Sequence, residues 1–309
     1  MISTVGTPAL WFAFTGAVVV LLLVDLGVFH RQPRDMTTGS ALRWSLFWIG
    51  LALAFNLFVA LRFGHQKGLE FLTGYLIEES LSVDNLFVFL FLFHYFRVPK
   101  PLQRRVLFWG ILGALVTRGL FIGVGTVLIH RFEWILYVFG VLLIYTGVGL
   151  FRGTQENIDP EKNLGLRFFR KLMPTVADFQ DAKFVVTKDH RRHATPLLVA
   201  LVTVEFSDVL FAIDSIPAIF AVTTDPFIVY TSNICAILGL RALYFLLAGA
   251  MDRFHYLHVG LALTLSFIGA KMVLKDVLEV STGHSLLVVA AFLAMAIVAS
   301  IVRPKREPT

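Results

Sequence analysis

The chain has 309 residues, of which 57% are hydrophobic and only 16% are charged, and its mean hydropathy is +0.77. This composition excludes an ordinary soluble domain and predicts an integral membrane protein. The net charge of +6 does not indicate a nucleic-acid partner, because most of the basic residues are expected on one side of a membrane. The single cysteine, Cys235, excludes a disulfide framework within the chain and a thiolate-rich metal site.

Apolar windows of about twenty residues, the length that one helix needs to cross a bilayer, occur nine times along the chain. The first window is interpreted as a retained span, because no basic segment of the kind found in signal peptides precedes it. We therefore predict an all-α membrane protein with nine transmembrane helices. They are expected at residues 9–29, 43–62, 70–96, 106–129, 133–151, 196–222, 227–250, 256–275 and 285–302.

The basic residues of the connecting loops predict how these helices are oriented. Loops on one side carry twenty Lys and Arg residues, whereas loops on the other side carry five. This asymmetry places the N-terminus outside and the C-terminus in the cytoplasm. The two remaining basic residues, Arg118 and Arg241, lie inside predicted spans.

One long polar segment interrupts the apolar pattern, and its many basic residues predict a cytoplasmic loop. It is either a plain connector or a partly ordered loop with a short amphipathic helix, at residues 164–173, lying on anionic lipid headgroups. We treat residues 1–303 as a single transmembrane domain and 304–309 as a cytoplasmic tail. The domain consists of a first half, 1–151, the loop, 152–194, and a second half, 195–303.

Two of the predicted spans carry acidic residues in an otherwise apolar background. A carboxylate in hydrocarbon is costly, so it persists only with a partner, a wet cavity or a bound cation. Each run therefore indicates a functional site, and two such runs in one chain suggest that they share it. The acids are Glu78, Glu79 and Asp84 in the run 77–92, and Glu205, Asp208 and Asp214 in the run 204–222.

The two acidic runs align with each other. When Asp84 is placed on Asp214, Glu78 falls opposite Asp208, and an amide or hydroxyl follows each aspartate. The next span of each half carries an arginine after the letters ILG, and the third span is rich in glycine. Spans three to five and six to eight thus resemble an inverted repeat, because an odd number of helices reverses the second copy. Many secondary transporters have this architecture.

Six residues correspond to a rotation of about 600° along a helix, so acids with this spacing point about 120° apart around its axis. The two acids of each run therefore cannot share one face of a regular helix. Either the helix is regular and one acid of each run lies away from the site, or the helix is broken between or just after the acids and both converge. In the second run Pro217 supplies a reason, because it frees the carbonyl of Ile213 beside Asp214. Broken helices would add carbonyl oxygens to the site.

Carboxylates, amides, hydroxyls and free carbonyls form a hard oxygen environment that suits Mn²⁺, Ca²⁺ or Mg²⁺. The nine histidines fall at span ends or in loops. Each acid has the alternative of a structural ion pair. The candidate metal ligands are Glu78, Asp84, Asp208 and Asp214, and the candidate further metal or proton sites are Glu79, Glu205, Asn85, Ser215 and Asp25.

Arg118 and Arg241 are the expected charge partners of these acids. Either they hold the carboxylates while no substrate is bound, or they form fixed salt bridges, because an unpaired buried charge is costly. An anion carrier centred on the two arginines is a rival hypothesis.

The residues just described also resemble a known family. The stretches EESLSVDNLFVF and FSDVLFAIDSIPAIFAVT, with VDLGVF and GLRALYF, are similar to the TerC family of integral membrane proteins within the LysE transporter superfamily. The resemblance runs from about Leu22 to Val273. The resemblance implies a manganese exporter of the bacterial inner membrane. The name of the family comes from an association with tellurite resistance. The implied site acids are Glu78, Asp84, Asp208 and Asp214, whereas Glu79 stands where relatives often have lysine.

We therefore predict export of Mn²⁺ or a similar hard divalent cation, coupled to protons because clustered carboxylates exchange protons for metal. The expected partners are the lipid bilayer, the transported metal and protons, with no nucleic acid and no cofactor. An enzyme is not expected, since no nucleophile–base pair, phosphate loop or zinc motif occurs. The alternative is a non-transporting membrane scaffold, linked to metal or tellurite resistance, whose basic loop docks partners.

Overall fold

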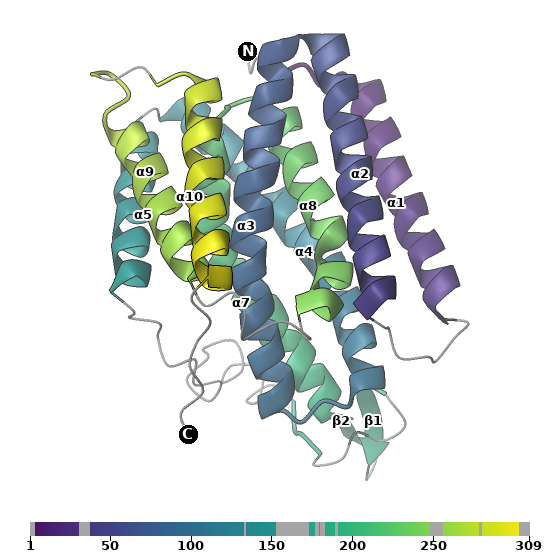
Figure 1. Cartoon of the computed structure of the whole chain (residues 1–309). Helices are drawn as coiled ribbons and strands as arrows, with labels where there is room; N and C mark the ends of the chain where they lie inside the picture. The colour runs from purple at the N-terminus through teal and green to yellow at the C-terminus, as the bar shows by residue number, and fades with distance from the viewer. Residues whose placement is uncertain are drawn as a thin grey trace.

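A computed structural model describes residues 4–30, 38–132, 134–152, 173–176, 179, 183–188, 191–247, 256–277 and 280–302 of the chain. The side chains of residues 25–30, 38, 83, 84, 87, 188, 257 and 258 lie outside that description. The described part is a bundle of nine helices with one small β-hairpin (Figure 1). The helices are α1 (Pro8–His30), α2 (Thr38–Phe63), α3 (His65–Tyr95), α4 (Lys100–Arg131), α5 (Ile135–Phe151), α7 (Pro196–Phe220), α8 (Pro226–Leu247), α9 (Leu257–Val273) and α10 (Thr282–Val302).

Each predicted apolar window coincides with one of these helices, which confirms the all-α class. Within the described residues, five helices have the length and hydropathy of a membrane span, and shorter apolar helices accompany them. The number of spans and their orientation stay predictions. The five segments are Gly39–Phe63, Lys100–Arg131, Pro196–Phe220, Pro226–Leu247 and Thr282–Val302.

Local chemistry explains where several helices begin. α7 and α8 start at Pro196 and Pro226, and proline suits the first turn because its missing N–H would have no partner there. Asp225 caps α8, since its Oδ1 accepts the backbone N–H of Phe227 at 3.0 Å. Gly64 joins α2 to α3 with a φ of 98°, a conformation that favours glycine.

Each helix of the first predicted repeat contacts its counterpart in the second: α3 contacts α7, α4 contacts α8, and α5 contacts α9, while α3 also packs on α8 and α4 on α7. The partners run in opposite directions, because early residues of one helix meet late residues of the other. Glu70, near the start of α3, accepts a hydrogen bond from Thr223, just beyond α7. Tyr244, near the end of α8, donates to Gln103 near the start of α4 at 2.9 Å. This is the arrangement that an inverted repeat produces.

Glycines allow α5 and α9 to approach closely. A Cβ atom at Gly269 would lie 2.6 Å from the carbonyl oxygen of Gly140, and one at Gly147 would lie 2.8 Å from that of Ala262. Small residues at such positions let two backbones pack against each other inside a membrane. The glycine-rich third span of each half therefore serves helix packing.

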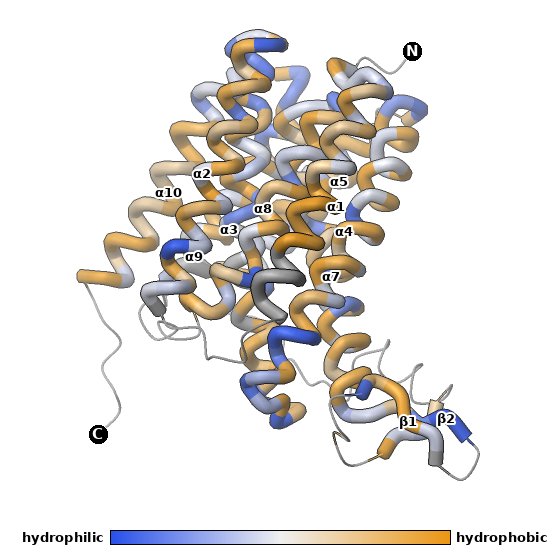
Figure 2. Tube along the Cα trace, turned by 90° about the vertical axis from the view of Figure 1, so that its right-hand side faces the viewer, coloured by the Kyte–Doolittle hydropathy of each residue, from blue (hydrophilic) through white to orange (hydrophobic). Residues whose placement is uncertain are grey.

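The bundle has an inner and an outer set of helices. Most residues of α8 are buried in the centre, whereas α1, α2 and α10 expose large apolar side chains such as Phe12, Leu61 and Leu287. Apolar residues run along the helices, and hydrophilic segments gather at the two ends and in the hairpin (Figure 2). This distribution is that of a bundle surrounded by lipid.

Of the two alternatives for the acidic helices, the broken helix is wrong and the regular helix is confirmed. α3 and α7 are continuous through their acids, and Pro217 lies in the last turn of α7. A proline this close to the helix end removes only one backbone hydrogen bond. The carbonyl groups of the last turn have no partner within the helix in any case, so the helix is not broken. The acids are therefore displayed by regular helices.

The predicted loop at 152–194 contains two strands, β1 (Val185–Lys188) and β2 (Arg191–Ala194), which pair antiparallel. The β-branched run at the start of β1 favours this conformation. Phe184, just before β1, contacts the ring of Trp109 in α4, with centroids 6.5 Å apart. The amphipathic helix predicted at 164–173 lies, except for its last residue, outside the described residues.

Candidate functional site

Arg118 of α4 is fully buried at the centre of a polar network between α3 and α7. Its Nη1 donates to Oε1 of Glu78. On the other side, Nη2 lies 3.0 Å from Oδ1 of Asp208, and Nε lies 3.4 Å from Oδ2 of the same carboxylate. The planar guanidinium thus holds one acid from each half of the chain, and grips Asp208 with two parallel hydrogen bonds.

Regular helix geometry explains which neighbours join the network. On α7, Ser215 lies seven residues after Asp208, so both face α4, and the Ser215 hydroxyl is 3.4 Å from Nη1 of Arg118. On α3, Ser82 follows Glu78 by one turn, and its hydroxyl is 3.5 Å from Oε1. Asn85, two turns after Glu78, is also buried.

Asn233 of α8 belongs to the network and was missed by the sequence reasoning. Its Nδ2 donates to Oε2 of Glu78 at 2.9 Å, and its own Oδ1 has no hydrogen-bond partner among the described residues. The signal that could have found it is an amide inside the apolar run VYTSNICAIL, where a polar side chain requires a partner.

The network is buried and carries unequal charge. Glu78 and Arg118 are 0% exposed and Asp208 is 4% exposed. Two carboxylates against one guanidinium leave a single negative charge on these three groups. Because a buried charge is costly without a counter-charge, this network favours the arrival of a proton or a further cation.

The structure does not bring all four predicted metal ligands together. Asp214 is half-buried and accepts a hydrogen bond from Thr146 of α5 at 3.1 Å, away from Arg118. The side chains of Asp84 and Asp25 lie outside the described residues. In the part of the chain that the structure describes, no three His, Cys, Asp or Glu side chains are placed to hold a metal ion.

Glu79 follows Glu78 but points elsewhere, because successive residues of a helix lie about 100° apart. Its carboxylate is hydrogen-bonded to Tyr75, one turn earlier on α3. Its Oε2 and the Nδ2 of Asn85 are buried and have no hydrogen-bond partner among the described residues. Glu79 is therefore a buried acid separate from the Arg118 network.

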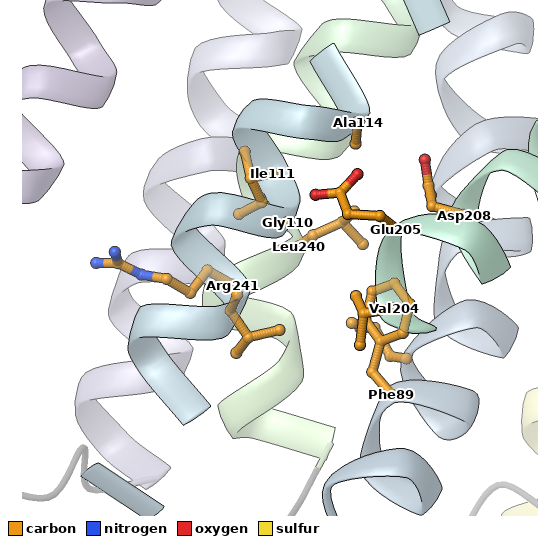
Figure 3. A pocket seen from close by; sticks show the side chains of 11 residues that line it. Phe89, Gly110, Ile111, Ala114, Val204, Glu205, Asp208, Leu240 and Arg241 are labelled. Atoms are coloured by element: carbon orange, nitrogen blue, oxygen red, sulfur yellow. The ribbon is translucent and has the colours of Figure 1, made fainter. Parts of the chain in front are cut away.

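Glu205 lies one turn before Asp208 and lines a small cavity between α3, α4, α7 and α8 (Figure 3). The cavity measures about 20 Å³, room for about one water molecule. The absence of a side chain at Gly113 makes space for the Glu205 carboxylate, since a Cβ there would lie 2.2 Å from both of its oxygens. A carboxylate thus reaches the inner wall of α4 beside the network.

Arg241 lines the same cavity, but its guanidinium points away from Glu205 and Asp208 (Figure 3). The sequence treated it as the counterpart of Arg118. However, Arg118 follows its ILG by five residues and Arg241 follows its ILG by two, so the two are almost one helical turn out of register. This difference places only Arg118 between the acids in the described structure.

Comparison with known proteins gives consistent results along nearly the whole chain. The family described as "Integral membrane protein TerC family" matches residues 63–307. An uncharacterized membrane protein of Myxococcus xanthus is 50% identical over 306 residues, covering 99% of this chain and 96% of the relative. A protein of Escherichia coli strain K12 named "Putative membrane-bound redox modulator Alx" is 47% identical over 305 residues. The match covers 96% of this chain and 95% of that protein. No solved structure matches the chain.

Proposed function

The chain belongs to the TerC family of integral membrane proteins, and from that membership we propose that it transports a hard divalent cation, Mn²⁺ or an ion of similar chemistry. The proposed direction is export across the bacterial inner membrane. The observation that carries the proposal is the buried contact of Glu78 and Asp208 with Arg118, at the meeting point of two antiparallel halves. Transporters built from inverted repeats bind their substrates at such an interface.

Arg118 is proposed to occupy the substrate position in the resting state. A divalent cation brings two positive charges to Glu78 and Asp208, and oxygen atoms from Ser82, Ser215 and Asn233 stand close by. These donors suit Mn²⁺. When the cation enters, Arg118 leaves, so that Glu78 and Asp208 face a positive charge in both arrangements.

The exchange of one cation for another gives a basis for alternating access. Because Arg118 ties α4 to both α3 and α7, its departure would loosen the two halves relative to each other. Glu79 and Glu205, two acids that Arg118 does not contact, are the proposed proton carriers. Asp84 and Asp214 are the proposed further ligands. Clustered carboxylates release protons when a metal binds.

The rival hypotheses have less support. An anion carrier would need free guanidinium groups, but Arg118 is already held by two carboxylates. A redox role, named for the Escherichia coli relative, cannot use a disulfide within this chain because Cys235 is its single cysteine. The scaffold alternative draws on exposed basic residues in and just before the hairpin, namely Lys183, Arg191 and Arg192. A transporter would keep ion flux when these three are replaced by glutamine, whereas a scaffold would lose its cellular role.

The proposal is tested by Mn²⁺ entry into proteoliposomes that contain a Mn²⁺-sensitive dye. Asp208→Asn removes one charge of the network, and we expect at least about a tenfold loss of flux, the equivalent of one ionic contact. Asp276→Asn is the matched control, since Asp276 is exposed and bonds to Tyr137 outside the network. Equal flux in the two variants would refute the site, and absence of flux in folded wild-type protein would refute transport of this ion.

A further inference from the structure

A second cavity lies at the other end of α3 from the hairpin, apart from the Arg118 network. It measures about 350 Å³, within the size range of small-ligand sites. Its walls come from both halves: the start of α3, one residue of α5, the end of α7 with the turn that follows it, and the end of α9. The polar groups that line it are Lys67, Glu70, Thr223, Thr224, Lys271 and Lys275.

The charges in this cavity do not balance. Glu70 supplies the carboxylate that lines the cavity. That carboxylate already has three partners. Lys67 forms a 2.7 Å ion pair with it, Thr223 donates to the same oxygen at 2.6 Å, and Gln66 lies 3.4 Å from the other oxygen. Lys67 also lies 3.7 Å from Asp225. Lys67 therefore already faces two carboxylates, Glu70 and Asp225, and contributes no unbalanced positive charge to the cavity.

Lys271 and Lys275 of the α9 end have neutral partners. The Nζ of Lys271 donates to the Ser285 hydroxyl at 2.9 Å, and the Nζ of Lys275 lies 5.0 Å from the ring centroid of Tyr137. Within the described part of the chain, neither ammonium group has a carboxylate at ion-pair distance. Both side chains are partly buried, and each ammonium group can donate three hydrogen bonds.

We propose that this cavity binds a small oxyanion, of the phosphate or sulfate type, between Lys271 and Lys275. Two partly buried ammonium groups in one cavity require a counter-charge, and lysine binds phosphate oxygens as a point charge. The Thr224 hydroxyl lines the same cavity and supplies a further donor. The volume exceeds that of one such ion, so hydrating water accompanies it. This site does not depend on the proposed transport of cations.

An oxyanion in this position would connect the two halves of the chain. Lys271 and Lys275 lie at the end of α9, whereas Lys67 lies at the start of α3 on the opposite wall. A bound anion is attracted by Lys271 and Lys275 and can accept a hydrogen bond from Lys67, which keeps its ion pair with Glu70, and so it holds α9 near α3 at this end of the bundle. Binding is therefore expected to raise the thermal stability of the protein as well as to fill the cavity.

Equilibrium dialysis of the detergent-purified protein against radiolabelled inorganic phosphate tests the site. We expect saturable binding by the wild type, at least about tenfold weaker binding by the variant Lys271→Gln/Lys275→Gln, and retained binding by Lys271→Arg. The matched control is Arg62→Gln/Arg131→Gln, which removes the same charge at helix ends outside the cavity. Unfolding curves check that each variant is folded.

The outcomes separate the sources of the anion. Phosphate binding that competes with sulfate supports a soluble ion, and binding of phosphatidylglycerol from nanodiscs with the same lysine dependence supports a lipid headgroup as the oxyanion. Equal phosphate binding by wild type and by Lys271→Gln/Lys275→Gln would overturn the proposal. The proposal would also be overturned if neither phosphate nor phosphatidylglycerol bound, or if the protein bound Mn²⁺ alone and lost that binding in Glu70→Gln.

Discussion

At the scale of single residues, the chemistry of the site depends on Arg118. A guanidinium in contact with two buried carboxylates offsets most of their repulsion, and the neutral groups of Ser215 and Asn233 complete the hydrogen bonding. Removing one member of such a set costs more than the set contributes as a whole, because the remaining charges stay buried without partners. Arg118 is therefore both a structural residue and the expected competitor of the substrate.

Replacement of this arginine separates the two roles. Arg118→Gln leaves Glu78 and Asp208 facing each other without a cation, and we expect it to lower the free energy of unfolding by about 3–5 kcal/mol. Mn²⁺ should then restore more stability to the variant than it adds to the wild type, because it replaces the missing positive charge. Thermal unfolding in detergent, with and without Mn²⁺, measures both effects. A variant whose stability is insensitive to Mn²⁺ would argue against a shared position.

At the scale of the helices, the spacing of acids decides what each one contacts. Because α7 is regular, Asp208 and Asp214, which are six residues apart, diverge: Asp214 contacts α5 while Asp208 contacts α4. Residues seven apart converge instead, which brings Ser215 to the network. Gly140 and Gly269 allow α5 to pack closely on α9, and Asp214 of α7 contacts Thr146 of α5 beside this pair.

Glycine substitutions test this packing. A Cβ at Gly269 would meet the carbonyl oxygen of Gly140 at 2.6 Å, and backbone atoms cannot move aside as a side chain can. We expect Gly269→Ala to cost about 1–3 kcal/mol of stability, as for other overpacked sites. Gly123→Ala is the control, since nothing lies within 4 Å of its Cβ position, and alanine there should add about 0.5–1 kcal/mol. Unfolding in mixed detergent compares the two; equal stability of both variants would contradict the close approach.

At the scale of the whole molecule, the two ends of the bundle have different character. One end holds the hairpin with its exposed cations, and the other holds the lysine-lined cavity and the N-terminal segment. Thr4 and Val5 of that segment donate to the Asp225 carboxylate at 2.8 and 2.9 Å. This contact fixes the start of the chain to the start of α8, at the end that the basic residues predict to be outside.

Labelling of cysteines in intact cells tests this orientation. Cys235→Ser gives a chain without cysteine, because Cys235 is the single one. In that background, Val277→Cys is expected to react with a membrane-impermeant maleimide, since Val277 is 79% exposed at the predicted outer end. Arg192→Cys in β2 should react only after the cells are permeabilised. The reverse pattern would show that the predicted orientation is wrong.

The helices, the membrane class, the family and the three charged residues that meet, Glu78, Asp208 and Arg118, could be predicted from the amino-acid sequence. Apolar length and acids in an apolar run are local properties, so they can be read without a structure. The tertiary structure decided that Arg118, not Arg241, lies between Glu78 and Asp208, that Asn233 joins them, and that Asp214 turns to Thr146. These contacts join residues far apart in the chain. They depend on the rotation and register of packed helices, which periodicity alone does not specify.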